Sequence, residues 1–316
     1  MLSGKMHKLS CVLQNAGCEN MELALMECVF MERVKLFTKP NFSANIGKIK
    51  ERLAICRFQE EAMIIKNEFP VMEFDDDKDA VVNPFKWNLE PFSTDKLIIT
   101  FFPEVINDLM ENGELELERH FGGENPVDIY RFKSQPDVMI TLGYVGCPAC
   151  AGNLEVFAAC GATKVMFCGG GGVLDKSIKV GELLVVEGAI RDEGFSYKYI
   201  EPSRYIYTDK KITQKITSYL EQHKISYLTG ITWTTDTMFR ETKALVEQRK
   251  TEGAKIVEME QSGCIAIAQF RHFDYGAIIY GGDDVSQDEW DTRSWDKRKG
   301  IRYNLVMLCR ELVKEF

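Results

Sequence analysis

The 316-residue sequence has little histidine and no apolar run of the length that crosses a membrane, which is about 20 residues. It also lacks a G-x-S-x-G element, so a serine hydrolase of that type is not expected. The four histidines, which form no cluster with metal-ligand spacing, are His7, His120, His223 and His272. We therefore expect no membrane segment, no metal and no other cofactor.

An excess of positive charge is absent as well, because 39 Lys and Arg residues stand against 48 Asp and Glu residues, for a formal net charge of −9. Nucleic-acid binding needs a basic surface that neutralises phosphates, so we exclude it. A small anionic ligand is still compatible with this charge, since a few arginines and backbone N–H groups can hold one phosphate.

Targeting and disulfide signals are also weak. Polar residues such as Gln14 interrupt the apolar residues that follow Lys8, so no signal-peptide core forms. The ten cysteines are scattered, and several lie in apolar, strand-like surroundings, for example Cys168 and Cys309. Buried free thiols in a reducing compartment explain this pattern best, and we expect a cytoplasmic protein.

The Cys147-Pro148-Ala149-Cys150 segment resembles a redox or metal-binding pair. No second pair lies at zinc-ligand spacing, so we favour a helix that starts near the proline. That helix is predicted to end at Cys160, with Gly161 as the residue that follows its C-cap.

The chain divides into two regions of different character. Residues 1–90 contain helical patches, such as Ile46 to Lys66, and an acidic stretch at Asp75 to Asp79 that we interpret as a loop. We interpret 1–90 as a helical N-terminal extension and 91–316 as the main domain.

From Lys96 onward, short apolar runs typical of buried strands alternate with segments of helical period. This alternation predicts a largely parallel, three-layer α/β architecture. The predicted strands are 97–101, 138–142, 165–168, 183–186 and 277–280, and helical spacing recurs at 212–220 and 301–312.

Four consecutive glycines, Gly169 to Gly172, follow one of these strands. A dinucleotide-binding G-x-G-x-x-G loop fails here, because the third glycine position is Leu174. Glycines without side chains would let a ligand approach the backbone closely, and a simple tight turn is an equally good interpretation.

Two carboxylate-bearing segments lie where predicted strands end. Glu258 and Glu260 flank Met259 at a strand-to-helix transition, where a carboxylate can accept hydrogen bonds from ribose hydroxyls. A solvated helix start is the alternative. Asp283 and Asp284 directly follow the last predicted strand, and at least one of them is expected to be a turn or helix-capping residue.

Taken in order, these segments resemble the purine nucleoside phosphorylase and uridine phosphorylase superfamily over roughly residues 95 to 290. The resemblance rests on the glycine segment, on Ala189 to Gly194, on Thr234 to Phe239, on the V-E-M-E element at 257–260 and on Gly282-Asp283. It implies that 91–316 form a catalytic domain with a three-layer α/β/α nucleoside phosphorylase-like fold and a mixed, partly barrel-like central sheet.

The resemblance also implies roles for individual residues. Glu260 would hold the ribose hydroxyls with Met259 beneath the sugar, and Asp283 would donate a proton to purine N7. Met238 and Phe239 would stack on the base. Further substrate-binding candidates are Glu258, Gly169, Gly170 and Arg119, the last matching an arginine that relatives lend to a neighbouring subunit. A homo-oligomer, dimer or hexamer, is expected on the same grounds.

The sequence departs from the family pattern at the phosphate site. Where many relatives have a phosphate-binding arginine and serine, this chain has Phe167 and Gly170, and the segment Phe102 to Val105 lacks a second arginine. Glu104 instead resembles a glutamate with which nucleosidase relatives activate water.

Three functions remain open from the sequence. The first is a phosphorylase that cleaves a nucleoside with inorganic phosphate as co-substrate, the second a nucleosidase that uses water, and the third a nucleoside-binding protein with little turnover. A purine is favoured, because the chain keeps Asp283 and has Arg240 to Lys243 where uridine-specific relatives carry Q-x-R.

Overall fold

A computed structural model describes residues 64–316 of the chain. Most of the predicted helical extension therefore lies outside the described residues, including the patch from Ile46 to residue 63 and four of the ten cysteines. The six described cysteines are free and buried, as the sequence predicted.

Residues 64–95 are an extended arm rather than a helix. Regular structure in it is limited to two 3-10 turns, η1 (Pro70–Met72) and η2 (Pro84–Lys86). The irregular backbone at Asp75 to Asp79 agrees with the loop predicted there, whereas residues 64–66, the last of the predicted helical patch, are not helical. Prolines begin both 3-10 turns. Lys198 Nζ donates to the carbonyls of Pro70 and Glu73 at 2.6 and 2.9 Å.

The remaining chain forms a ten-stranded sheet, with nine strands in the order β10-β6-β8-β9-β5-β1-β4-β3-β2 and β7 paired to β6. Strand β10 also pairs with β5, so β5, β10, β6, β8 and β9 close into a ring. The predicted partly barrel-like sheet is confirmed. The strands are β1 (Lys96–Thr100), β2 (Leu115–Phe121), β3 (Val127–Phe132), β4 (Val138–Leu142), β5 (Lys164–Val173), β6 (Leu183–Asp192), β7 (Tyr205–Tyr207), β8 (Leu228–Thr235), β9 (Ala254–Glu258) and β10 (Asp274–Asp284).

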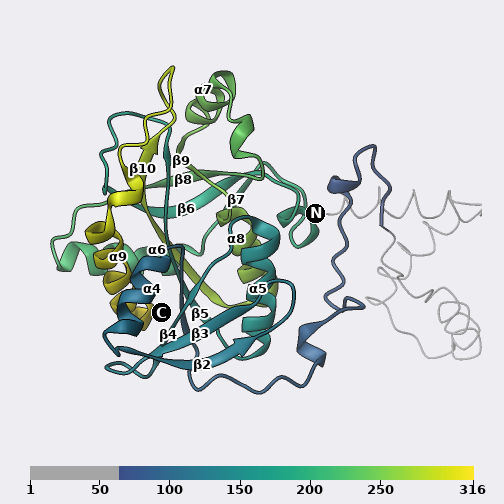
Figure 1. The fold of residues 1–316 in the computed structure, drawn as a ribbon. Coiled ribbons are helices and arrows are strands. Elements are labelled where there is room, and N and C mark those ends of the chain that lie inside the picture. Colours follow the sequence, from purple (N-terminus) through teal and green to yellow (C-terminus); the bar gives the residue numbers. More distant parts are fainter. Residues whose placement is uncertain (1–63) are drawn as a thin grey trace, which may run out of the picture. The chain divides into compact units, whose positions relative to one another are not determined.

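Helices cover both faces of the sheet (Figure 1). One apolar core lies beneath α5 and α8, a second beneath α4, α6 and α9, and a smaller one beneath α7. The longest described helix, α9, has 14 residues, and none in this part of the chain is long and apolar enough to cross a membrane. The helices are α4 (Pro103–Glu111), α5 (Cys147–Ala159), α6 (Lys210–Gln222), α7 (Lys243–Thr251), α8 (Gln261–Arg271) and α9 (Lys299–Leu312).

The four glycines belong to strand β5 and do not form the predicted loop. Gly169, Gly170 and Gly171 pair with consecutive residues of β10. A Cβ on Gly171 would lie 2.5 Å from the carbonyl oxygen of Val257, a distance that side chains do not adopt. The loop prediction is wrong because these glycines serve the close approach of β9 to β5 and not a change of chain direction.

Candidate active site

Glu258, the last residue of β9, anchors the junction between that strand and helix α8. Its Oε1 accepts hydrogen bonds from the hydroxyls of Thr232 and Thr234 at 2.9 and 2.5 Å. Its Oε2 accepts from the backbone N–H groups of Glu260 and Gln261 at 2.6 and 2.7 Å. Four donors occupy this buried carboxylate, so Glu258 fixes the geometry of the junction and has no acceptor position left over.

Glu260, two residues later, is buried at 6% exposure but has few partners. Its Oε1 accepts from the backbone N–H of Gly146, which precedes α5, at 2.7 Å. Burial raises the pKa of both carboxyl groups, and with the neighbouring Glu258 charge it raises that of Glu260 to about 8. Because Glu258 has four donors, we place the negative charge of the two on Glu258 and the proton on Glu260 near neutral pH.

A third buried carboxyl group, Glu193, supports the same junction and was missed by the sequence reasoning. It accepts from the Ser262 hydroxyl at 2.9 Å and also from the Ser196 hydroxyl. Ser262 N–H in turn donates to Thr234 Oγ1 at 3.0 Å. A polar network thus runs from Glu193 through Ser262 and Thr234 to Glu258. In the sequence, the one signal that pointed to Glu193 was its place in the A-I-R-D-E-G segment, residues 189–194.

The two aspartates at the end of β10 have different surroundings. Asp284 is buried, accepts from Ser286 N–H at 2.8 Å and pairs with Arg293 at 2.6 Å, so it is the turn residue that the sequence predicted. Asp283 is partly exposed, and its Oδ2 accepts from the indole N–H of Trp290 at 2.7 Å. Asp283 therefore keeps one carboxylate oxygen for another partner.

The glycines of β5 lie between Glu260 and Asp283. Gly172 pairs with Val257 of β9, three residues before Glu260. On the other side, Asp283 Oδ2 lies 3.4 Å from the position that a Cβ on Gly172 would occupy. Gly170 is exposed although its strand is paired within the sheet, so solvent reaches the backbone at this point. The strand register thus brings the two predicted catalytic residues to the same glycine segment.

The segment after β8 adds apolar and acidic side chains. Met238 and Phe239 form the 3-10 turn η4 (Met238–Arg240) and are 46% and 94% exposed, so no described residue covers the phenylalanine. Glu241 follows the turn, and burial together with the charge of Asp283 raises its pKa to about 7. The sequence reasoning missed Glu241, because its neighbour Asp283 lies 42 positions further along the chain.

Aromatic rings occupy the positions that the resemblance assigns to phosphate ligands. Phe167 is buried and packs on Phe101 with ring centroids 5.1 Å apart. A Cβ on Gly170 would lie 2.7 Å from the Tyr280 ring, so that ring covers the place of a serine side chain. Arg302 contacts this ring: its guanidinium donates to Tyr280 Oη at 3.1 Å and to Glu104 Oε1 at 2.7 Å.

Arg119 is not brought to the glycine segment by any contact within the described residues. Its guanidinium donates to the carbonyls of Glu90 and Pro91 at 2.6 and 3.1 Å and lies over the Phe92 ring. These contacts tie β2 to the arm of the same chain.

The cysteine pair forms the start of α5, as predicted. The helix begins at Cys147 and is followed by Gly161 with φ +96°. Cys147 Sγ lies 3.3 Å from the Met259 carbonyl oxygen, and Cys150 Sγ lies 3.9 Å from Cys264 Sγ. Among residues 64–316, no group of three or more potential ligands is arranged to hold a metal ion.

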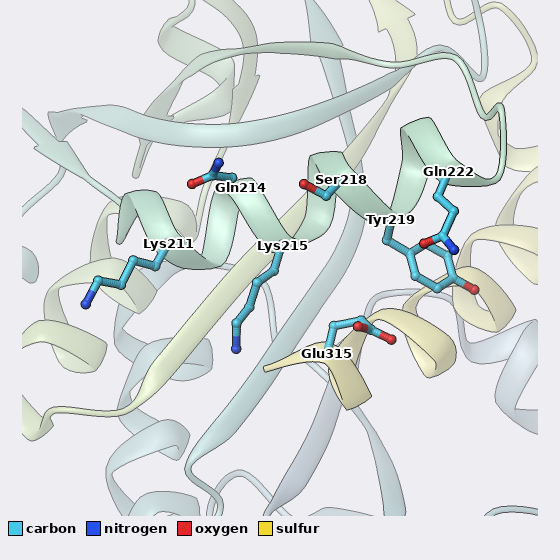
Figure 2. Close-up of a pocket in the computed structure, with 7 residues that line it drawn as sticks. All are labelled: Lys211, Gln214, Lys215, Ser218, Tyr219, Gln222 and Glu315. Atoms are coloured by element: carbon cyan, nitrogen blue, oxygen red, sulfur yellow. The ribbon is translucent and has the colours of Figure 1, made fainter.

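Two surface hollows lie away from these residues. One of about 490 Å³ runs along the outer side of α6, where Figure 2 shows Lys211, Lys215 and Tyr219 with Glu315 opposite. Another of about 330 Å³ is lined by Arg191, among others. None of the predicted site residues lines either hollow, so the candidate site is defined by its side chains and the exposed glycine backbone.

A family model described as the phosphorylase superfamily matches residues 95–316. The chain is 28% identical to uridine phosphorylase from Thermococcus kodakarensis over 109 residues, which are 34% of this chain and 39% of that protein. It is 25% identical to guanosine phosphorylase from Halorubrum lacusprofundi over 142 residues, 45% of this chain and 59% of that protein. The chain therefore matches less than two thirds of the length of either curated relative.

Solved structures are similar over more of their length. Uridine phosphorylase from Vibrio fischeri superposes with a TM-score of 0.59 at 21% identity, covering 72% of this chain and 98% of that chain. AMP nucleosidase from Bacteroides thetaiotaomicron gives a TM-score of 0.56 at 19% identity, covering 70% and 88%. At these identities the likeness establishes a shared fold.

Proposed function

Because the chain belongs to the phosphorylase superfamily, we propose that it cleaves the N-glycosidic bond of a nucleoside by phosphorolysis, giving a free base and ribose 1-phosphate. The observation that carries this proposal is Glu260, a buried carboxyl group with a single partner beside the exposed glycine backbone of β5. A buried acceptor with unused capacity suits the paired hydroxyls of a ribose.

The two ends of a bound nucleoside would meet different side chains. Glu260 would accept hydrogen bonds from the ribose hydroxyls, with Met259 against the sugar. As the glycosidic bond breaks, positive charge develops on the sugar, and the one negative charge that Glu258 and Glu260 carry between them stabilises it. Met238 and Phe239 would cover the base, and the free oxygen of Asp283 would deliver a proton to N7 of the leaving base.

We propose a purine as the base, because Asp283 can protonate a purine N7 and the chain has no Q-x-R element after Phe239. The curated relatives named for uridine and for guanosine leave both classes open as substrates to test.

Hydrolysis by water is the second candidate. The observation that favours it is that aromatic rings fill the places assigned to phosphate ligands. Phe167 stands at the arginine position and packs on Phe101, and the Tyr280 ring covers the serine position at Gly170. Glu104 at the start of α4 could activate the water once it leaves Arg302. A third candidate, a nucleoside-binding protein with little turnover, has no observation of its own in its favour.

One assay separates the candidates. Release of base from adenosine, inosine, guanosine and uridine is followed with and without inorganic phosphate, and the sugar product is identified. Phosphate-dependent release with ribose 1-phosphate supports phosphorolysis, whereas phosphate-independent release with free ribose supports the hydrolase. Tight nucleoside binding in a calorimeter without any product would support the binding protein and overturn both.

A homo-oligomer, dimer or hexamer, belongs to the same proposal. For Arg119 to enter a neighbouring subunit's site, it would first have to release the carbonyls of Glu90 and Pro91. Sedimentation measurements of the full chain test the assembly directly.

A further inference from the structure

Trp290 is an exposed aromatic residue in direct contact with the candidate general acid. Its indole N–H donates to Asp283 Oδ2 at 2.7 Å, and 63% of the residue's surface is exposed. Tryptophan combines a large apolar ring with one polar N–H, so it can hold a polar partner at its edge and still offer the face of its ring to a ligand.

The backbone that carries Trp290 is fixed beside the acid. Residues 285–290 form a loop that is closed by Asp284 and Asp291, whose backbone groups exchange hydrogen bonds at 2.8 and 3.1 Å. Arg293 donates to the carboxylate of Asp284 at 2.6 Å and so binds the two ends of the loop together. Trp290 directly precedes Asp291, so it stands at the closed end of the loop and not at its tip.

The bond from Trp290 also determines which oxygen of Asp283 is available. A Cβ on Gly172 would lie 3.4 Å from Asp283 Oδ2 and 3.2 Å from Val285 Cγ1, so Oδ2 lies between the glycine segment and the indole N–H. Within residues 64–316, the other oxygen, Oδ1, accepts no hydrogen bond. The carboxyl group is therefore held through one oxygen and offers the other to a ligand.

The loop of Trp290 is joined to the turn that carries the other exposed ring of the site. Lys243 begins α7, just after the η4 turn with Phe239, and it forms an ion pair with Asp288 in the loop. Two exposed aromatic side chains thus belong to segments that are tied together, and both are free to contact a flat base.

We propose that Trp290 positions Asp283 and contacts the base of the nucleoside. The inference rests on the proposed function and adds a residue to it. The indole N–H holds Asp283 Oδ2, Oδ1 gives its proton to N7 of the base, and the exposed indole ring stacks on the same base.

The contribution of the N–H to the rate comes from the charge that forms during the step. The bond between C1′ and the base breaks, its electron pair leaves with the base, and N7 takes the proton of Asp283. The hydrogen bond from Trp290 strengthens as the carboxylate appears, because bonds to charged acceptors are stronger than bonds to neutral ones. The attacking phosphate or water loses the proton that restores Asp283.

Two variants separate the two roles. Trp290→Phe keeps an aromatic ring but removes the donor, so kcat for purine nucleosides should fall roughly 10-fold while KM changes little. Trp290→Ala removes the ring as well, and KM should also rise roughly 5- to 100-fold, which is the usual worth of one stacked base. Trp87→Phe, which changes an exposed tryptophan of the arm, is the matched control and should keep both constants.

A double-variant cycle tests whether Trp290 acts on the rate through Asp283. In the Asp283→Asn background, Trp290→Phe should lower kcat no further, because the group that the N–H serves is already gone. A merely structural role of Trp290 would lower kcat by the same factor in both backgrounds. Wild-type kcat in Trp290→Phe, or an equal loss in both backgrounds, overturns the positioning role.

Fluorescence tests the contact with the base without any turnover. The free bases adenine and hypoxanthine are titrated into the full chain while tryptophan emission is recorded. We expect quenching in the wild type and in Trp87→Phe, and none in Trp290→Phe. Quenching that persists in Trp290→Phe, or none in the wild type, overturns the contact. Absence of base release by the wild type from every nucleoside overturns the proposed function instead.

Discussion

The two sides of the β5 glycine segment differ in the kind of side chain that surrounds it. On the Glu260 side, buried carboxylates are held by hydroxyl and backbone donors in a network that runs from Glu193 to Glu258. On the other side, the rings of Phe101, Phe167 and Tyr280 pack around the glycines. The difference teaches that the hydrogen-bonding side chains are gathered at the strand–helix junction, whereas the glycine segment of β5 carries no charged side chain.

The largest expected effect is that of Glu260→Ala, which tests whether the polar side of the glycine segment holds the sugar. If Glu260 holds two ribose hydroxyls, the loss of hydrogen bonds worth about 1.5–3 kcal/mol each should lower kcat/KM roughly 100- to 10,000-fold. Steady-state kinetics measure the effect, with the exposed Glu201→Ala as a control of unchanged activity. Near-normal kcat/KM in Glu260→Ala would place the sugar elsewhere.

Asp283→Asn tests the base side, with an expected loss of about 100-fold in kcat, which is typical for a general acid. The asparagine keeps the size of the side chain and a carbonyl oxygen for Trp290, so folding should be preserved. Single-turnover kinetics separate the chemical step from binding. Turnover within a few-fold of the wild type would remove Asp283 from the mechanism.

Gly171→Ala tests, through the free energy of unfolding, whether the close contact between β5 and β9 requires a glycine. The new Cβ would lie 2.5 Å from Val257 O and from Ile256 Cγ2, so the strands must shift, at a cost of about 1–3 kcal/mol. Gly152→Ala is the matched control, because its Cβ meets nothing within 4 Å inside helix α5 and should stabilise by about 0.5–1 kcal/mol. Urea unfolding of both variants checks the opposite signs.

The smallest expected effect concerns pH and stability on the Glu260 side. Since folding raises the pKa of Glu260 from 4.5 to about 8, the contribution of its protonated form is complete below pH 4.5 and is lost as pH rises through about 8. The melting temperature should therefore fall less between pH 6 and pH 9 in Glu260→Gln than in the wild type. Equal slopes in the two proteins would contradict the buried proton on Glu260.

The sequence predicted those strands and helices whose pattern is visible within a few neighbouring residues, and it missed those without such a pattern. The buried, mostly apolar strands β1 and β4 were predicted within a residue of their ends, because burial on both faces leaves a nearly continuous apolar run. The ends of α5 were predicted equally well. Strands β2 and β3 were not predicted, since charged residues such as Glu116 and Arg131 interrupt their alternation. Helices α4 and α7 were missed as well, being only nine residues each.

The candidate site likewise divides into residues that the local sequence predicted and contacts that depend on the packing of distant segments. Glu260 and Asp283 were predicted because both lie where strands end, a position visible in the sequence. Their partners were not, because the bonds to Gly146 and Trp290 depend on how separate segments pack. The glycines of β5 were misread for the same reason, since the neighbour that requires them is β9, more than 80 positions later.

The closing of β5, β10, β6, β8 and β9 into a ring leaves β2 as the last strand of the path at the other end. Within residues 64–316 no strand pairs with its outer edge, and an edge of this kind allows strands from other copies to pair with it and aggregate. Here β2 carries charged side chains, has a register irregularity between Leu117 and Arg119, and is tied to the arm through Arg119. Removing the arm beyond Glu90 would take away the carbonyls that hold Arg119 of this edge strand, and we expect shortened versions of the protein to aggregate more readily.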